Sequence, residues 1–416
     1  MKIALAVHGT RGDVEPCAAV GRELLRRGHD VRMAVPPNLI GFVESAGVPG
    51  AVAYGPDSQK QLDADFFRDF WKVQNPVTLV RKGMDYITEG WAEMSETLMA
   101  LSEDADILLT GTTYQEVVAN VAECRGIPLA ALHYFPARVN SHIVAFPAPS
   151  AVVRSVWTAA EWLHWRMMKN AEDAQRRALG LPRATARCAR RIVDGGALEI
   201  QAYDELFFPG LAKEWGDKRP FVGALTMELP TTTDDEVSSW IAAGTPPIYF
   251  GFGSMPVESP AEAVAKISGV CAELGERALI SSGVWALDDE GAYGDHVKLV
   301  GAVNHAAAFP LCRAVVHHGG AGTTAAGVRA AVPTLILWVG ADQPVWATHV
   351  KRLQVGTARR FSSTNRDKLA TALRKVLAPE VAVRAREVAT QLTKPKASVS
   401  AAADLLEEKA GVMAAR

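Results

Sequence analysis

The segment AVVHHGGAGTT, from Ala314 to Thr324, carries the clearest chemical pattern in the chain. An apolar run ends at His317 and His318, glycines follow, and helical character resumes at Thr323, which predicts a strand, a turn and a helix N-terminus. Glycines admit a ligand close to the backbone, and the unpaired N–H groups of a first helical turn attract anions. We therefore expect this turn to bind a phosphate or a diphosphate, although a strand-to-helix turn without a ligand has the same pattern.

A shorter motif, HGTRGD, follows the first apolar segment and ends at Asp13. Its glycine spacing is too short for a dinucleotide fingerprint, and Pro36 and Pro37 stand where that fingerprint requires an acidic residue, which disfavours a nicotinamide enzyme. Asp13 immediately precedes a predicted helix, so its carboxylate is an N-cap, a general base toward a hydroxyl group, or both. His8 and Arg11 share the turn and also suit a structural histidine and a solvated charge.

Three further motifs, GFGS, GAVNH and GADQP, each follow a predicted strand. In the first, Ser254 could hold the same diphosphate from the opposite side. In the second, free backbone groups could read the flat edge of a base, and the indole of Trp285 could stack on it, although a core tryptophan is the commoner role. In the third, Asp342 and Gln343 offer acceptor oxygens and an amide donor, which suit sugar hydroxyls as well as a helix cap.

Two carboxylate pairs, Asp63 with Asp65 and Asp104 with Asp106, have the DxD spacing of metal-binding residues. The first pair lies in a charged, helix-like segment, and the second precedes a strand instead of ending one. A helix N-terminus with His318 beside it could neutralise a diphosphate without Mg²⁺. We therefore expect no metal site and no cofactor.

The chain has 416 residues, 49% of them hydrophobic and 22% charged, which is typical of a globular protein of about two or three domains; we expect two. Its net charge of -2, with no basic run that stands out, gives no reason to expect nucleic acid. The N-terminal apolar segment is too short for a signal peptide, and scattered cysteines in odd number suit reduced thiols, so we expect a cytoplasmic protein. The cysteines are Cys17, Cys124, Cys188, Cys271 and Cys312.

Strands and helices are predicted to alternate in two α/β blocks, the pattern of parallel sheets covered on both faces. We expect one domain over residues 1–217, a linker rich in Pro, Gly and Thr over 218–245, and a second domain over 246–395. Residues 396–416 should form a helix that packs back on the first domain. Because such sheets bind ligands at the carboxyl ends of their strands, the expected site is a cleft between the two domains. The predicted strands cover residues 2–7, 30–35, 107–110, 129–134, 248–252, 278–282, 298–303 and 334–338.

Aromatic residues gather in the first half of the chain and suggest a bulky, partly apolar ligand, although aromatic residues at helical spacing are more often core. Charged residues interrupt the aromatic-rich stretch 151–168, so it cannot cross a bilayer but could touch a membrane surface or a lipophilic ligand. The aromatic residues in question are Phe66, Phe67, Phe70, Trp71, Trp157, Trp162 and Trp165.

The ordered set GTRGDVEP, GFGS, GAVNH, VVHHGGAGTT and GADQP resembles the nucleotide-sugar-dependent glycosyltransferases of the GT-B fold in bacteria and fungi. That branch includes enzymes of glycopeptide-antibiotic synthesis, sterol glucosyltransferases and mycobacterial glycopeptidolipid glycosyltransferases. The likeness covers essentially the whole chain. It implies two Rossmann-like, doubly wound parallel-sheet domains facing across a cleft, the first binding the acceptor and the second the nucleotide-sugar donor.

Carried onto this sequence, the resemblance implies that Asp13 is the general base of an inverting displacement. It also implies a backbone contact from Val303 to the base, and sugar contacts from Asp342 and Gln343. Related plant enzymes have a base-stacking tryptophan where Ala302 stands and a histidine in place of Asp13, so their catalytic dyad and stacking contact do not transfer. The implied diphosphate site consists of Ser254, His318, Gly320, Gly322 and Thr323. The acceptor-side candidates are His8, Thr10, Phe70 and Trp71.

The implied substrates are a UDP- or dTDP-sugar carrying a hexose or 6-deoxyhexose, and a hydroxyl of a bulky lipophilic acceptor such as a glycopeptidolipid, another glycolipid, a sterol or a natural product. Peripheral association with the inner face of the plasma membrane through the acceptor stays open. Two alternatives remain: a sugar-nucleotide epimerase of the same fold, and a sugar-nucleotide-binding protein without catalysis. An epimerised sugar nucleotide would identify the first, and binding without turnover would favour the second.

Overall fold

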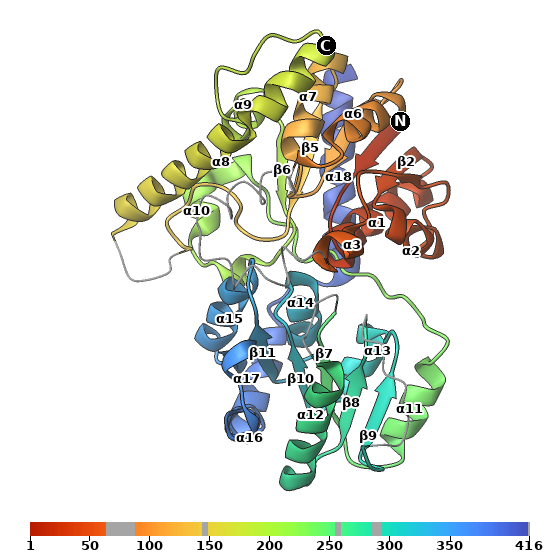
Figure 1. Cartoon of the computed structure of the whole chain (residues 1–416), viewed down its shortest axis with the longest axis vertical. Helices are drawn as coiled ribbons and strands as arrows, with labels where there is room; N and C mark the ends of the chain where they lie inside the picture. Colours follow the sequence, from red (N-terminus) through yellow and green to blue (C-terminus); the bar gives the residue numbers. More distant parts are fainter. Residues whose placement is uncertain (64–87, 144–148, 254–258, 284–292, 415–416) are drawn as a thin grey trace. The chain divides into compact units, whose positions relative to one another are not determined.

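The computed structural model of the chain forms two compact units (Figure 1). Unit 1 comprises Met1–Leu225 together with Pro395–Arg416, and unit 2 comprises Thr226–Lys394. The expected linker, residues 218–245, therefore extends into unit 2, where Asp234–Ala242 forms helix α11. The structure describes residues 1–63, 88–143, 149–253, 259–283 and 293–414.

Unit 1 is built on a six-stranded parallel sheet in the order β3-β2-β1-β4-β5-β6. The direction of winding changes between β1 and β4, which makes this the topological switch point of the sheet. Strand β4 is buried along its whole length, as expected for a parallel sheet covered by helices on both faces. The strands are β1 (Lys2–Ala6), β2 (Asp30–Val35), β3 (Val52–Ala53), β4 (Ile107–Thr110), β5 (Leu129–His133) and β6 (Leu198–Gln201). The helices are α1 (Arg11–Arg26), α2 (Ile40–Ser45), α3 (Ser58–Asp63), α6 (Trp91–Leu101), α7 (Gln115–Arg125), α8 (Ser150–Ala178), α9 (Cys188–Asp194), α10 (Leu211–Trp215) and α18 (Pro395–Ala414).

Unit 2 repeats this architecture with the strand order β12-β11-β10-β7-β8-β9, and its switch point lies between β7 and β10. The apolar side chains of β7 and β10 pack against α12 and α16 in one continuous core that includes Phe250, Val316 and Leu373. The strands are β7 (Ile248–Gly251), β8 (Ala278–Ser281), β9 (Val297–Val300), β10 (Ala314–His317), β11 (Thr334–Trp338) and β12 (Gly356–Arg360). The remaining helices are α12 (Pro260–Leu274), α13 (His305–Ala308), α14 (Ala321–Arg329), α15 (Gln343–Arg352), α16 (Arg366–Val376) and α17 (Pro379–Ala389).

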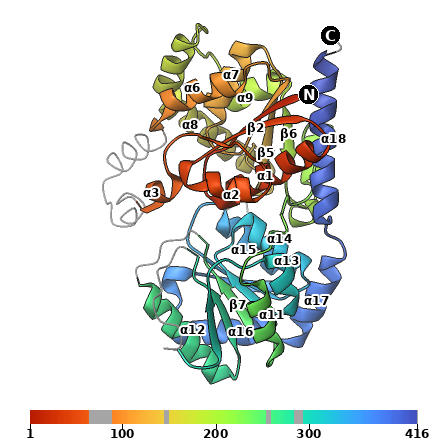
Figure 2. The ribbon, with the colours of Figure 1, turned by 90° about the vertical axis from the view of Figure 1, so that its right-hand side faces the viewer.

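The last helix, α18, lies along α1 in unit 1 (Figure 2). Arg27, which follows α1, donates to the carboxylates of Asp404 and Glu407 at 2.6 and 2.8 Å. His29 lies 2.7 Å from the second oxygen of Glu407. The C-terminal helix is therefore part of the unit that the N-terminus begins. Among the described helices, none is long and apolar enough to cross a membrane.

Candidate active site

At the switch point of the unit 2 sheet, the loops that follow β7 and β10 contact each other. A Cβ atom on Gly253, which follows β7, would lie 3.1 Å from Cε1 of His318, which follows β10. Gly253 has a φ of +60°, a conformation that favours glycine. Because ligands of open α/β sheets bind where the winding changes direction, His318 lies where a ligand of unit 2 is expected.

The imidazole of His318 is closely packed against glycine backbone. A Cβ atom on Gly320 would lie 2.7 Å from Nε2 of the ring, so a larger residue at position 320 would displace the histidine. Burial lowers the pKa of His318 to about 4, opposed in part by a hydrogen bond with the backbone of Gly251. The ring is therefore neutral at neutral pH. Within the described part of the chain, its Nδ1 atom is buried and has no hydrogen-bond partner.

The preceding residue, His317, holds the turn in place and was not among the residues predicted for the site. The N–H of Gly319 donates to Nδ1 of His317 at 3.0 Å, which requires a neutral ring with its proton on Nε2. Complete burial lowers the pKa of His317 well below its usual value and favours this form. Gly319 has a φ of +99°, and a Cβ atom there would lie 2.7 Å from Ile336. The alternation of side chains along β10 was the available signal that His317 points into the unit.

Helix α14 begins directly after these glycines and leaves its first turn open. Gly320 is the N-cap, and the first backbone bond of the helix runs from the N–H of Thr324 to the carbonyl of Gly320 at 2.9 Å. The N–H groups of Ala321, Gly322 and Thr323 therefore have no partner inside the helix. The first turn contains no acidic residue, and a Cβ atom added to Gly322 would meet nothing within 4 Å. The predicted residues His318, Gly320, Gly322 and Thr323 thus form one turn suited to an anion.

The start of α15 lies against the same turn. A Cβ atom on Gly319 would be 3.2 Å from Cβ of Gln343. The side-chain oxygen of Gln343 accepts from the backbone N–H groups of Val339 and Gly340 at 2.8 and 3.3 Å. Asp342 occupies the N-cap position, but its side chain does not cap the helix.

The carboxylate of Asp342 instead holds a tryptophan. Its Oδ2 atom accepts from the indole N–H of Trp346 at 2.9 Å, and burial raises the pKa of this carboxyl group. The alternative that Asp342 caps α15 through its side chain was therefore wrong. An anchored carboxylate beside an amide donor is a suitable pair for sugar hydroxyl groups.

The predicted base-binding segment is only partly described. Strand β9 ends at Val300, three residues before the predicted end. The side chain of Val303 is buried in the core with Phe309 and Val332. Only the backbone of Val303 is therefore left to contact a ligand, as its predicted role requires. Ser254 and Trp285 lie outside the described residues.

In unit 1, the structure corrects the position of Asp13. Helix α1 begins at Arg11, and Thr10 is its N-cap, so Asp13 is the third helical residue and not the N-cap. Its Oδ2 atom accepts from the backbone N–H of Thr10 at 2.8 Å and from the Thr10 hydroxyl at 3.2 Å, as in a capping box. A Cβ atom on Gly9, whose φ is +140°, would lie 2.3 Å from this oxygen. Glycine at position 9 thus makes room for the carboxylate.

His8 is held by the protein on several sides. Its Nε2 atom lies 2.9 Å from the carbonyl oxygen of Pro56, its ring packs edge-on against Tyr114, and its own carbonyl accepts from the hydroxyl of Thr113. Burial lowers its pKa. The last two contacts join the loops after β1 and β4, so His8 holds the switch point of the unit 1 sheet together. Phe70 and Trp71, the other acceptor-side candidates with Thr10, lie outside the described residues.

Tyr134, which was not predicted from the sequence, contacts the first turn of α1 through its hydroxyl group. Its hydroxyl donates to the backbone carbonyl of Asp13 at 2.8 Å and lies 3.4 Å from the thiol of Cys17. Burial raises the pKa of Tyr134 well above its usual value, so the hydroxyl remains a donor. Over the described ranges, no group of three or more His, Cys, Asp or Glu side chains is placed to hold a metal ion.

Comparison with known proteins agrees with this architecture. Residues 3–91 match the glycosyltransferase family 28 N-terminal domain, and residues 272–408 match the C-terminal domain of erythromycin biosynthesis protein CIII-like proteins. An uncharacterized glycosyltransferase of Mycobacterium tuberculosis is 64% identical over 414 residues, which cover 99% of both chains. The chain belongs to this glycosyltransferase family.

More distant proteins also match over the full length of the chain. Glycosyltransferase GtfE of Amycolatopsis orientalis is 32% identical over 435 residues, which cover both chains completely. The crystal structure of glycosyltransferase VinC in complex with dTDP matches with a TM-score of 0.66 and 16% identity, covering 99% of this chain and 100% of the other. The fold is GT-B, with two parallel sheets of the predicted doubly wound type.

Proposed function

We propose that this glycosyltransferase moves a sugar from a UDP- or dTDP-sugar to a hydroxyl group of a bulky, lipophilic acceptor. The observation that carries the proposal is the first turn of α14, which offers three backbone N–H groups without a partner inside the helix, contains no acidic residue and follows a neutral His318. Such a turn stabilises the two charges of a leaving nucleoside diphosphate. The dTDP complex of VinC supports a nucleotide donor for this fold.

The sugar of the donor would be held by Asp342 and Gln343. The two residues lie at the start of α15, which contacts the glycine turn at Gly319. A ligand whose diphosphate lies on α14 would therefore bring its sugar toward these two side chains. Trp346 fixes one oxygen of Asp342, which leaves the other for a sugar hydroxyl. Ser254, the backbone of Val303 and the indole of Trp285 remain the proposed contacts to the rest of the nucleotide.

Asp13 is the proposed general base. Thr10 orients its carboxylate by hydrogen bonding, and the carboxylate fits in this position because Gly9 has no side chain. Proton removal from the acceptor hydroxyl would let the oxygen attack the anomeric carbon from the face opposite the nucleotide, with inversion of configuration. The helix N-terminus and His318 would neutralise the departing diphosphate, so the reaction as proposed requires no metal ion.

A panel of nucleotide sugars tests the donor half of this proposal. We expect a dTDP- or UDP-sugar to raise the melting temperature, because a ligand that binds only the folded state stabilises it. His318→Ala and Asp342→Ala should weaken that shift. If no nucleotide sugar stabilised the wild-type protein, the proposed function would be wrong.

Mass spectrometry of incubations with lipophilic alcohols tests the transfer half. The expected product is the acceptor plus one hexosyl or 6-deoxyhexosyl group, with an anomeric configuration opposite to that of the donor by NMR. Retention of configuration would exclude the single displacement. An epimerised sugar nucleotide, or donor binding without any product, would point to one of the two alternatives instead.

A further inference from the structure

The first half of helix α8 presents apolar side chains to solvent. Val152, Val156 and Leu163 are 47%, 60% and 55% exposed, and Trp162 is 53% exposed. The spacing of the three aliphatic residues places them in one row along the helix. An exposed apolar row of this kind marks a surface that meets another apolar phase or partner.

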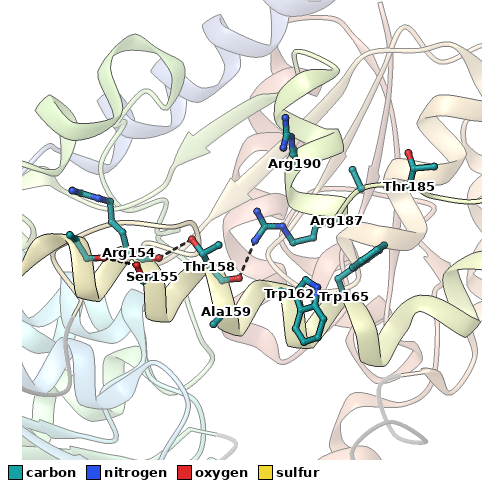
Figure 3. A pocket seen from close by; sticks show the side chains of 11 residues that line it. Arg154, Ser155, Thr158, Ala159, Trp162, Trp165, Thr185, Arg187 and Arg190 are labelled. Atoms are coloured by element: carbon teal, nitrogen blue, oxygen red, sulfur yellow. Dashed lines mark hydrogen bonds between the residues drawn. The ribbon is translucent and has the colours of Figure 1, made fainter.

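A hollow of about 810 Å³ adjoins this row on the neighbouring face of α8 (Figure 3). Trp162 and Trp165 line it together with Arg154, Arg187 and Arg190, and Figure 3 shows Arg187 directed toward α8 above the two indoles. No carboxylate is among the described residues that line it. Indole rings beside guanidinium groups are typical of the boundary between water and the acyl region of a membrane.

The charge of this region is opposite to that of the whole protein. Residues 150–194, from the start of α8 to the end of α9, contain nine Lys and Arg against four Asp and Glu, a net charge of +5, whereas the complete chain carries -2. The arginines of the hollow have carboxylate neighbours outside its lining: Glu214 for Arg154, Glu161 for Arg187 and Asp194 for Arg190, at 3.6, 3.5 and 3.2 Å. The pair of Arg190 is exposed on both sides and holds weakly, so the guanidinium can turn to a phosphate. The sequence presents these cations as scattered, and the fold gathers them around one helix.

We propose that the exposed row and basic hollow of α8 form a docking surface for an anionic lipid bilayer. Val152, Val156, Leu163 and Trp162 would enter the interface between headgroups and acyl chains, and the arginines would contact the lipid phosphates. This inference goes beyond the proposed function and does not depend on it. It gives the protein a way to meet a lipophilic acceptor where that acceptor is dissolved.

The arrangement favours a bilayer over other partners. A nucleic acid would use the arginines and indoles but would gain nothing from three solvent-facing aliphatic side chains. A second copy of this chain would have to face the same net charge of +5, which opposes association. An anionic bilayer satisfies both the apolar row and the charge.

Flotation of the full-length protein with lipid vesicles tests the proposal. We expect flotation with vesicles of phosphatidylcholine and phosphatidylglycerol, little with phosphatidylcholine alone, and a decrease at high salt. Val156→Asp with Leu163→Asp should lower the partition coefficient at least about tenfold. The matched control is Val383→Asp, since Val383 is an exposed valine on α17, 47% accessible, and it should partition as wild type.

The basic part is tested separately with Arg190→Gln, which should weaken binding to anionic vesicles and its salt dependence. Arg374→Gln, a similarly exposed arginine that pairs with Glu273, should leave both unchanged. Absence of flotation with anionic vesicles would overturn the proposal, as would equal loss for the test and control variants. It would also be overturned if the α8 variants lost binding to RNA in place of vesicles, or turned a dimer into a monomer by light scattering. Folding of each variant is checked by its melting temperature.

Discussion

The first turns of α1 and α14 share one plan and differ in one residue type. Each follows a strand at the switch point of its sheet, and each begins within the same pattern, HGxxG, over residues 8–12 and 318–322. Burial lowers the pKa of both histidines, and the glycine after each has a positive φ, +140° at Gly9 and +99° at Gly319. The two units therefore use the same local device.

The difference lies at the third residue of each helix, which is Asp13 in α1 and Thr323 in α14. In α1, the carboxylate of Asp13 accepts from Thr10, so the protein supplies the anion for its own helix N-terminus. In α14, the corresponding turn has no acidic residue and space in front of Gly322. The first turn of α1 is therefore occupied by a carboxylate of the protein itself, and the first turn of α14 is suited to the anion of a ligand.

Removing the charge of Asp13 in the first turn of α1 should have the largest effect. Asp13→Asn keeps an oxygen that can accept from Thr10, so α1 should remain capped while the base is lost. We expect kcat to fall about 10²- to 10⁴-fold, with donor affinity unchanged, measured by steady-state kinetics and calorimetry. A variant within a few-fold of wild type would show that Asp13 is a capping residue alone.

The second largest effect is expected when the first turn of α14 receives an aspartate, as the first turn of α1 has. Thr323→Asp places a carboxylate at the position equivalent to Asp13, where it would cap α14 and repel the diphosphate. Two like charges about 4 Å apart cost roughly 1–4 kcal/mol, so donor affinity should fall about fivefold to a thousandfold while the melting temperature holds or rises. Thr323→Asn is the uncharged control and should bind the donor far better than Thr323→Asp. Equal affinities of these two variants would place the diphosphate elsewhere.

The histidine of the open turn should make stability depend on pH. Because the pKa of His318 is about 4 in the folded protein and higher when unfolded, the unfolded state binds more protons between these values. Stability should therefore fall as the pH drops from about 6.5 toward 4, by up to about 3 kcal/mol from this residue. Urea unfolding at several pH values should show a shallower decline for His318→Gln. An identical decline in both proteins would mean that other groups, such as His317, account for it.

Alanine substitutions at Gly9 and Gly322, one glycine from each turn, should change the free energy of unfolding in opposite directions. Gly9→Ala drives a methyl group into the Asp13 carboxylate and should destabilise unit 1 by about 1–3 kcal/mol. Gly322→Ala meets nothing and should stabilise α14 by about 0.5–1 kcal/mol, yet reduce donor affinity by filling the space in front of the turn. Thermal melts with and without donor measure both effects. Similar destabilisation by both substitutions would remove the distinction between the turns.

Chelation should have the smallest effect. Since the open turn and His318 are proposed to neutralise the leaving diphosphate, EDTA should leave turnover within experimental error, and added Mg²⁺ should not raise it. A loss of activity in EDTA that Mg²⁺ restores would show that the turn alone does not suffice.

The sequence predicted the strands whose side chains are apolar except for one threonine, such as β4 and β11, with their observed bounds. It missed β6, because Glu199 and Gln201 interrupt its apolar pattern. Both are buried polar residues, paired with Arg138 and His133 from elsewhere in the fold. It also missed β12, which ends in two arginines at the edge of its sheet. Long-range partners of this kind leave no local signal.

The candidate site shows the same limit: local residue patterns were predictive, and long-range contacts were not. The glycine turn at His318 could be located because its residue types alone require it. The start of α1 was placed at Val14, three residues late, because Gly12 and Pro16 are poor helix formers that hide the first turn. Tyr134 contributes through a contact that depends on the assembled sheet, so residue spacing did not reveal it. His317 binds the nearby N–H of Gly319, and its signal, the alternation of side chains along β10, was missed.

The return of α18 to unit 1 has a consequence for shortened forms of the protein. Arg27 and Asp404 are separated by 377 positions in the sequence, yet they form one ion pair. A premature stop that deleted only the last twenty residues would leave the glycine turn of unit 2 intact. The damage would instead appear beside the first helix, where Arg27 would keep Glu23 but lose its partners on α18, and the core would lose Ala402 and Leu406.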